Sequence, residues 1–272
     1  MTKNLDNDGL RSIVENYDIF YIDLWGVVHN GITLHKNAIE ALDEITKANK
    51  DYVLLTNAPR PNKVVKTILE KMGMSKEIRD KVYSSGEASL SYLKKNYSNK
   101  LFYHIGPTRD FDLFLDFKKN KTKYIKDSQY LLCTGLFEEQ EDDLDYFKEL
   151  LKEHMDKVMI CTNPDLIVDK GSRRELCAGS VALIFEKMGG KVIYFGKPFP
   201  EVYNQAINNE GKRILSIGDN LNTDIKGANN QNFANLLITN GIHRQEVENE
   251  NFEKIMKKYN TKVDYTQSKL KW

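Results

Sequence analysis

Short apolar runs that end in polar residues alternate with helical patterns in the first part of the chain. The run Ile19–Ile22 stops at Asp23, and a glycine follows three positions later. Such a run predicts a buried strand, with the acid placed where the strand ends and the chain turns. Residues 35–50 have the spacing of an amphipathic helix, and the next run, at 52–55, ends at Thr56. Two strands joined by a helix predict a βαβ unit with parallel strands and a right-handed crossover.

The middle of the chain, from about residue 83 to 190, has the pattern of a second set of strands and helices. Its strand candidates are 101–105, 130–133 and 157–161, and its helix candidates are 142–155 and 176–188. Two glycines, Gly189 and Gly190, stop the last of these helices. The alternation predicts a second α/β module between two parts of the first.

The last part of the chain returns to the pattern of the first module. Its expected elements are a strand at 192–195 that starts the return, a helix up to 209, and strands at 213–217 and 236–238. Lys197 follows the first of these strands, and Asp219 follows the second. We interpret residues 5–16 as a short helix before the first strand, and the polar tail from residue 246 onward as a surface helix with a loose end.

Composition and charge are those of an ordinary globular protein. Lys and Arg total 40 against 39 Asp and Glu, so the formal charge is only +1, which gives no electrostatic basis for binding nucleic acid or an anionic membrane. The three cysteines are widely spaced and suggest neither a disulfide framework nor a zinc site. The polar N-terminus does not resemble a signal peptide, and no apolar run is long enough to span a membrane. We therefore predict a cytoplasmic protein.

Polar side chains follow four of the predicted strands. They are Asp23, the pair Thr56 and Asn57, Lys197, and the segment that begins at Asp219 and ends at Asp224. Because the carboxyl ends of parallel strands in one sheet share an edge, we expect these side chains to converge there. Carboxylates from two strands can hold Mg²⁺ and leave positions for water and a substrate phosphate, and a hydroxyl, an amide and a lysine can bind the other phosphate oxygens. A single acid after a strand can equally cap the next turn, so the argument depends on all four segments together.

In this order, the four segments resemble the four sequence motifs of the haloacid dehalogenase (HAD) superfamily. The resemblance implies that Asp23 is a nucleophile that forms an aspartyl-phosphate. It also implies that Lys197 orders the phosphate and the nucleophile, and that phosphate is bound by Lys197 together with Thr56, Asn57 and Ala58. The implied Mg²⁺ ligands are Asp23, Asp219, Asp224 (directly or through water) and the backbone carbonyl of Trp25.

A finer resemblance is to the class IIA branch, which contains p-nitrophenyl phosphatases and ribonucleotide or sugar phosphatases. That branch inserts an α/β cap domain between its second and third motifs, and the stretch 83–190 has the right size and place. Further similar segments lie at 162–165, 177–180, 196–198 and 218–224, so the resemblance covers nearly the whole chain. It implies a Rossmann-like core of residues 1–82 and 191–272, a substrate-selecting cap of residues 83–190, a small phosphorylated metabolite as substrate, and pairing of two chains through the cap.

The chain departs from the phosphatase pattern at one catalytic position. Phosphatases of this family carry a second Asp two residues after the nucleophile, where this chain has Trp25. That Asp protonates the leaving alkoxide and then activates water, and an indole ring can do neither. Loss of a general acid–base group typically slows a reaction by about 10²–10⁴-fold, least for leaving groups that are stable as anions. In the second motif, Ala58 stands where a second Asn is usual.

Three functions are consistent with this departure. The first is a weak or specialised Mg²⁺-dependent phosphatase, which the joint presence of Asp23, Lys197 and Asp219 favours. The second is a different hydrolase on the same scaffold, because haloacid dehalogenases have an aromatic residue, Tyr, at the position of Trp25. Those enzymes do not use Mg²⁺, however, whereas this chain keeps the acidic fourth motif. The third is a non-enzymatic protein that binds a phosphate ligand and uses the cap as an interaction surface.

Other residues near these motifs have two interpretations each. His29 is a substitute proton donor if its loop folds back, although the family pattern gives it no such role. Arg60 either contacts substrate phosphate or starts a surface helix. Arg173 and Arg174 either face an anionic substrate group or belong to a solvated loop of the cap. Asp165 either shapes the cap side of the cleft or belongs to a simple turn.

Overall fold

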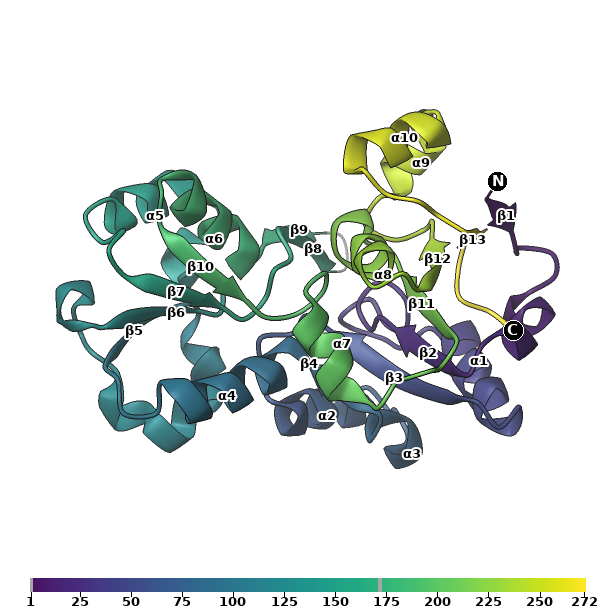
Figure 1. Ribbon diagram of the computed structural model, residues 1–272, viewed down its shortest axis with the longest axis horizontal. Coiled ribbons are helices and arrows are strands. Elements are labelled where there is room, and N and C mark those ends of the chain that lie inside the picture. Colours follow the sequence, from purple (N-terminus) through teal and green to yellow (C-terminus); the bar gives the residue numbers. More distant parts are fainter. Residues whose placement is uncertain (1, 171–172) are drawn as a thin grey trace.

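Two parallel sheets, with an antiparallel hairpin between them, organise the chain (Figure 1). The computed structural model describes residues 2–170 and 173–272. In these ranges the larger sheet has seven strands, in the order β1-β13-β12-β11-β2-β3-β4, and the smaller sheet has four, in the order β10-β7-β6-β5. Every pairing within these two sheets is parallel. The predicted α/β class with a parallel core sheet is therefore confirmed.

The larger sheet is built from both ends of the chain. Its strands are β1 (Lys3–Asn4), β2 (Ile19–Ile22), β3 (Asp51–Thr56), β4 (Val82–Ser84), β11 (Ile214–Gly218), β12 (Ala234–Ile238) and β13 (Tyr265–Gln267). Its helices are α1 (Lys36–Lys47), α2 (Asn62–Lys71), α3 (Lys76–Arg79), α7 (Pro200–Ala206), α8 (Lys226–Asn230), α9 (Arg244–Asn249) and α10 (Phe252–Tyr259). All four residues of the interior strand β2 are buried. Parallel strands covered on both faces have continuous apolar runs rather than alternation, which explains the sequence of β2.

Different helices cover the two faces of the larger sheet. Phe20 and Ile22 of β2 pack in one apolar cluster with α1 and α2. Tyr21 packs in another cluster with Val202 and Tyr203 of α7. Because successive side chains of a strand point to opposite faces, helices close both faces of the sheet, and the edge where the strands end is left for a ligand.

The smaller module, which we call the cap, repeats this layered arrangement. Its strands are β5 (Phe102–Ile105), β6 (Tyr130–Cys133), β7 (Val158–Cys161) and β10 (Lys191–Tyr194), and its helices are α4 (Ser85–Asn96), the 3₁₀ segment η3 (Thr108–Asn120), α5 (Leu144–Leu151) and α6 (Ala178–Lys187). α5 and α6 pack on one face of the sheet, and α4 and η3 pack on the other. The hairpin of β8 (Ile167–Lys170) and β9 (Arg173–Leu176) extends from this module toward the larger sheet (Figure 1).

The predicted boundaries between the two modules are wrong by one strand at the second crossing. β10 pairs with β7 in the smaller sheet, so the cap extends to Tyr194 and the return to the core does not begin at residue 191 or 192. At the first crossing, β4 pairs with β3 and belongs to the larger sheet through Ser84. A four-residue apolar run indicates that a strand forms, but it does not indicate which sheet the strand joins.

The two ends of the chain also differ from the prediction. Residues 5–16 contain two short 3₁₀ turns, Leu10–Ser12 and Val14–Asn16, instead of one helix. The tail is not loose, because β13 lies between β1 and β12. Strands of two or three residues are too short to show a period in the sequence, and their place is set by pairing with distant segments.

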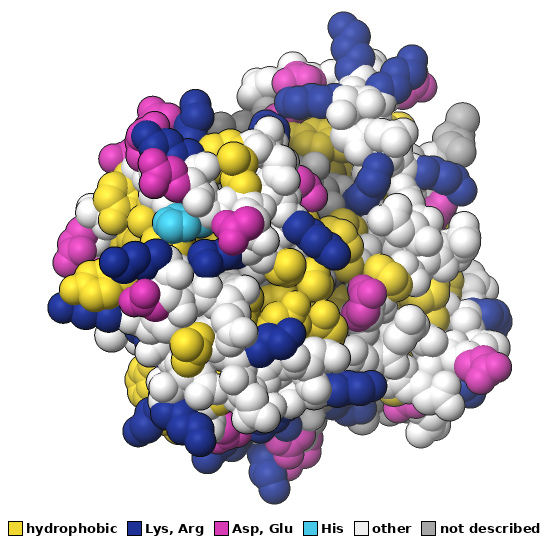
Figure 2. Space-filling view, turned by 60° about the vertical axis from the view of Figure 1, so that its left-hand side comes forward, with side chains coloured by type: hydrophobic (Ala, Val, Ile, Leu, Met, Phe, Trp, Pro, Cys, Tyr) yellow, Lys and Arg dark blue, Asp and Glu magenta, His cyan; other side chains and the backbone are white. Residues whose placement is uncertain are grey.

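The face of the molecule in Figure 2 has no single strong electrostatic character. Lys and Arg side chains are interspersed with Asp and Glu across the face shown in Figure 2, as expected for a formal charge of +1. Within the described part of the chain, no helix has both the length and the apolar composition needed to cross a membrane.

Candidate active site

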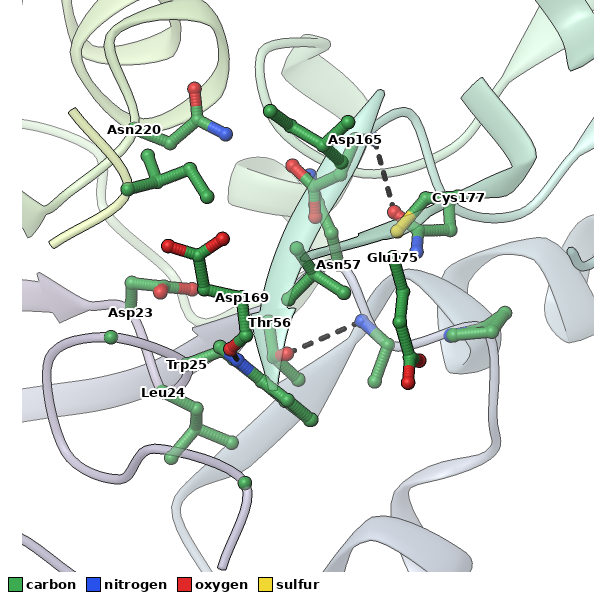
Figure 3. Close-up of a pocket in the computed structure, with 18 of the residues that line it drawn as sticks. Asp23, Leu24, Trp25, Thr56, Asn57, Asp165, Asp169, Glu175, Cys177 and Asn220 are labelled. Atoms are coloured by element: carbon green, nitrogen blue, oxygen red, sulfur yellow. Dashed lines mark hydrogen bonds between the residues drawn. The ribbon is translucent and has the colours of Figure 1, made fainter. Parts of the chain in front are cut away.

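The polar residues predicted to converge do so at the carboxyl edge of the larger sheet. Asp23 directly follows β2, Thr56 ends β3, and Asp219 directly follows β11, and these three strands are neighbours. A pocket of about 640 Å³ opens at this edge between the core and the cap. It is lined by all eight predicted site residues, namely Asp23, Trp25, Thr56, Asn57, Ala58, Lys197, Asp219 and Asp224. Figure 3 shows Asp23, Thr56 and Asn57 of the core close to Asp165 and Asp169 of the cap.

Glycines let the backbone approach the carboxylates closely. Gly26, in the turn after Asp23, has a φ of +85°, and a Cβ at this position would overlap the carboxylate of Asp219. A Cβ at Gly241 would overlap the same carboxylate. Asp219 is thus enclosed by two backbone segments, and Ile242 N–H donates to its Oδ2 at 2.8 Å. Gly26 is needed for this enclosure as well as for the turn.

Lys197 is the centre of the charged cluster. Its Nζ lies 2.5 Å from Asp23 Oδ1, 2.7 Å from Asp224 Oδ1 and 2.8 Å from the backbone oxygen of Leu55. The lysine side chain is only 3% exposed. Burial alone would lower the pKa of Lys197, but the charges of Asp224 and Asp23 outweigh it and raise this pKa above its ordinary value. The ammonium group is therefore fully charged at neutral pH.

Three carboxylates cluster beside this ammonium group, and two of them, those of Asp23 and Asp224, pair with it. The ligand oxygens of Asp23, Asp219 and Asp224 lie within 4.8 Å of one another, and all three residues are buried. Burial raises the pKa of Asp23 to about 8, in spite of the opposing effect of Lys197, and it raises the pKa of Asp219 well above its usual value. Burial has this effect because a carboxylate without enough positive charge nearby is costly in a low-dielectric site. A divalent cation among these oxygens would supply the missing charge, and oxygen ligands of this kind fit a hard cation such as Mg²⁺.

The second motif is more constrained than its sequence shows. Thr56 Oγ1 accepts a hydrogen bond from Ala58 N–H at 3.2 Å. Asn57 Oδ1 accepts from Lys197 N–H at 2.8 Å, and Asn57 Nδ2 donates to Lys197 O at 3.0 Å and to Asp165 Oδ1 at 3.1 Å. The side chain of Asn57, expected to bind phosphate, is thus engaged in fixing the backbone of Lys197 and the chain segment that carries Asp165.

Trp25 contacts the cap from the position of the usual second Asp. Its indole Nε1–H donates to the backbone oxygen of Asp169 on β8 at 2.5 Å. The ring of His29 packs edge-on against it, with ring centroids 5.2 Å apart. A Cβ at Gly31 would overlap the outer ring of the indole. The side chain of Trp25 is therefore a contact between the two modules.

His29 is a poor substitute for the missing acid. It is buried, and its Nδ1 accepts a hydrogen bond from Gly31 N–H at 2.9 Å, which places the ring proton on Nε2. Burial, with a smaller effect of His35, lowers the pKa of His29 to about 4. The imidazolium form is therefore scarce near neutral pH.

The three arginines that had two interpretations in the sequence, Arg60, Arg173 and Arg174, all form ion pairs. Arg60 Nε lies 3.0 Å from Asp110 Oδ1, and both side chains are largely buried, so Arg60 is not a free surface arginine. Arg173 is exposed and pairs with Glu141 at 2.9 Å. Arg174 pairs with Asp169 at 2.8 Å. Among the pocket-lining residues that the sequence analysis missed, Asp110 and Asp169 pair across the module boundary, and no local sequence pattern indicates such pairs.

Comparison with known proteins identifies the family. A family model described as haloacid dehalogenase-like hydrolase matches residues 20–117, and a related HAD-hydrolase-like model matches residues 194–261. Phosphoglycolate phosphatase 2 of Arabidopsis thaliana is 23% identical over 269 residues, which cover 88% of each chain. A haloacid dehalogenase-like hydrolase from Brucella suis has a similar structure, with a TM-score of 0.84, 28% identity, and coverage of 96% of this chain and 98% of that one.

A glycerol phosphate phosphatase from Mycobacterium tuberculosis, solved in complex with magnesium, shares the fold with a TM-score of 0.64 and 21% identity, covering 85% of this chain and 71% of that one. The motif-based resemblance is therefore confirmed, including the fold shared with p-nitrophenyl phosphatases. The chain belongs to the haloacid dehalogenase-like hydrolases.

Proposed function

We propose that the protein hydrolyses small phosphate monoesters in two steps, through a phosphorylated Asp23. The main support is the contact of one buried lysine, Lys197, with two of three clustered carboxylates, those of Asp23 and Asp224. The ammonium group at 2.5 Å orients the carboxyl group of Asp23 and favours its ionised form, which is the form that a nucleophile needs. The named phosphatases among the relatives support phosphate esters as the substrate class.

The chemistry follows from the residues around Asp23. In the first step, an oxygen of Asp23 attacks phosphorus, the bond between phosphorus and the ester oxygen breaks, and the alcohol leaves as its anion. In the second step, water attacks the phosphorus of phospho-Asp23, which releases phosphate and restores the carboxylate. Lys197 stabilises negative charge on the phosphate in both steps. Thr56 and the backbone N–H groups that follow it are the proposed donors to the phosphate oxygens.

We propose Mg²⁺ as the cation of the site, held by Asp23, Asp219 and Asp224 and by the backbone carbonyl of Trp25. The proposal is supported by the surplus of buried carboxylates over ammonium groups in the cluster and by the magnesium complex of a relative with the same fold. When bound, the ion supplies positive charge to the phosphate oxygens. Lys197 pairs with Asp23 and Asp224 but forms no ion pair with Asp219, so Asp219 depends most on this ion.

Mg²⁺ is expected to stabilise the folded protein and to lose this effect in Asp219→Asn. A ligand present at a hundred times its dissociation constant stabilises the native state by about 2.7 kcal/mol. Urea unfolding with Mg²⁺ and with a chelator measures this difference. Asp51→Asn, an exposed acid at the opposite end of β3, is the control and should respond to Mg²⁺ as wild type does. Equal stabilisation of Asp219→Asn and wild type would remove Asp219 from the metal site.

Turnover is expected to depend steeply on the leaving group. Trp25 fills the position of the general acid, and His29 is neutral near pH 7, so the leaving oxygen departs without a strong proton donor. We expect kcat/KM to fall by about 10²–10⁴-fold from aryl or acyl phosphates to simple alkyl phosphates. Release of phosphate from a series of monoesters graded by the pKa of the alcohol measures this slope.

The same series separates the alternative functions. High activity on alkyl phosphates would mean that another group supplies the proton, and His29→Gln would be tested next. No release from any ester, with or without Mg²⁺, would favour a protein that only binds a phosphate ligand. Activity confined to haloacids would favour the dehalogenase alternative, which the three clustered carboxylates do not support. Pairing of two chains through the cap and a cytoplasmic location stay predictions.

A further inference from the structure

The contacts of Trp25 belong to a larger connection between the core and the cap. Asp169, whose backbone oxygen accepts from Trp25, also has a carboxylate bound by two arginines. Arg174, on the same hairpin, donates to both of its oxygens at 2.8 and 3.2 Å. Arg244, at the start of α9 in the core, donates to Asp169 Oδ2 at 2.6 Å. Asp169 is thus held by the core through its backbone and its side chain at once.

This connection continues to the carboxylate cluster through one residue. Arg174 Nη2 donates to the backbone oxygen of Ile242 at 3.2 Å, and Ile242 N–H donates to Asp219 Oδ2 at 2.8 Å. The loop that binds Asp219 is therefore the same loop that receives the cap hairpin. The hairpin in turn lines the pocket with Ile167, Val168 and Leu176. Figure 3 shows Asp169 of this hairpin beside Trp25 and Asp23, with Glu175 on the far side of Asn57.

We propose that Trp25 and Arg244 are positioning residues that hold the cap hairpin over the carboxylate cluster through Asp169. Together with Asp169 and Arg174 they form what we call the Asp169 latch. At the position where the family resemblance implies a proton-transferring acid, this chain has a side chain that binds the cap hairpin. The leaving group would then contact a pocket surface, formed by the hairpin, whose position the latch fixes. This inference rests on the proposed function, because it assigns the latch to binding of the ester's leaving group.

The latch predicts a separation of KM from kcat. Trp25→Phe keeps an aromatic ring against His29 but removes the N–H, and Arg244→Gln removes the charge that reaches Asp169. Each variant is expected to raise KM for an aryl phosphate by about three- to tenfold, the effect of one hydrogen bond, with a smaller change in kcat. The double variant is expected to raise KM by no more than the product of the two single fold-changes, because both substitutions act on Asp169. Arg213→Gln, which breaks an exposed pair with Asp18, is the matched control and should leave both constants unchanged.

Fluorescence tests the latch without any turnover. The chain has two tryptophans, so Trp272→Phe leaves Trp25 as the only reporter. In that background, Arg244→Gln is expected to increase quenching of Trp25 emission by acrylamide, and Arg213→Gln is not. Unchanged quenching and unchanged KM in Arg244→Gln would overturn the latch. If Arg244→Gln does not fold, an unchanged KM in Trp25→Phe overturns it instead. Increased quenching in a protein that hydrolyses no ester would support the latch as a docking contact and reject the proposed function.

Discussion

Asp23→Asn is expected to abolish turnover of every phosphate ester while the fold stays intact. An amide cannot act as the nucleophile, and loss of a nucleophile in a cooperating set of residues costs on the order of 10⁴–10⁶-fold in kcat. Asp23 is buried and paired with Lys197, but Lys197 keeps its contacts with Asp224 and Leu55 in the variant. Steady-state release of phosphate from an aryl phosphate, together with a urea unfolding curve, measures both parts of this prediction.

The matched control for this variant is Asp51→Asn. Asp51 is exposed and begins β3, so it lies at the opposite end of the sheet from the site. This variant should keep wild-type turnover and stability. If kcat of Asp23→Asn falls by much less than about 10⁴-fold while Asp51→Asn behaves as wild type, another residue is the nucleophile.

Lys197→Gln is expected to affect stability as well as turnover. Removing one partner from a buried ion pair leaves uncompensated charge and costs about 3–5 kcal/mol. Here the lysine serves both Asp23 and Asp224, and its side chain is almost completely buried. Turnover is expected to fall by about 10²–10³-fold, the effect of losing one donor to developing charge.

Urea unfolding and steady-state kinetics of Lys197→Gln test this expectation. Mg²⁺ should recover part of the lost stability, because it brings positive charge to the same carboxylates. Lys262→Gln, which breaks an exposed pair with Asp264, is the control and should remain near wild type in both measurements. If Lys197→Gln is as stable as wild type in the absence of metal, the buried ion pairs of Lys197 with Asp23 and Asp224 do not stabilise the site.

The core of the site is predictable because its signals are local. The apolar run Ile19–Ile22 and the acid directly after it both lie within five residues of sequence, and the convergence of strand ends follows from parallel pairing. The parallel neighbours β2, β3 and β11 then bring Asp23, Thr56 and Asp219 to one edge. The composition served only to argue against classes of partner, since a formal charge of +1 gives no reason to expect a polyanionic partner.

The contacts that join the two modules are not predictable from the sequence. The bond from Trp25 to Asp169 connects residues 144 apart, and the bond from Asn57 to Asp165 connects residues 108 apart. The sequence shows that Trp25 is not an acid, but only the fold shows what its N–H contacts. The prediction that β10 belongs to the larger sheet was wrong for a similar reason, because its partner β7 lies far away in the chain. Side-chain identity indicates chemistry, whereas the partner depends on how distant strands pack.

We also expect the covalent intermediate to accumulate. With a good leaving group, attack by Asp23 is fast, but no acid–base Asp is present at position 25 to activate water for the second step. Phospho-Asp23 should therefore form faster than it is hydrolysed, and the alcohol should appear in a burst before steady release of phosphate. This expectation needs only the proposed nucleophile and the presence of Trp25 at the position where the family resemblance implies an acid.

The most direct test is to mix the protein with a phosphorus-labelled aryl phosphate and Mg²⁺, quench the mixture within the first turnover, and locate the label on the chain. We expect up to one equivalent of label on the peptide that contains Asp23 in wild type and in Asp51→Asn, and none in Asp23→Asn. Label on Asp23→Asn equal to that of wild type, or an unlabelled wild type that also releases no phosphate, would contradict the proposed reaction.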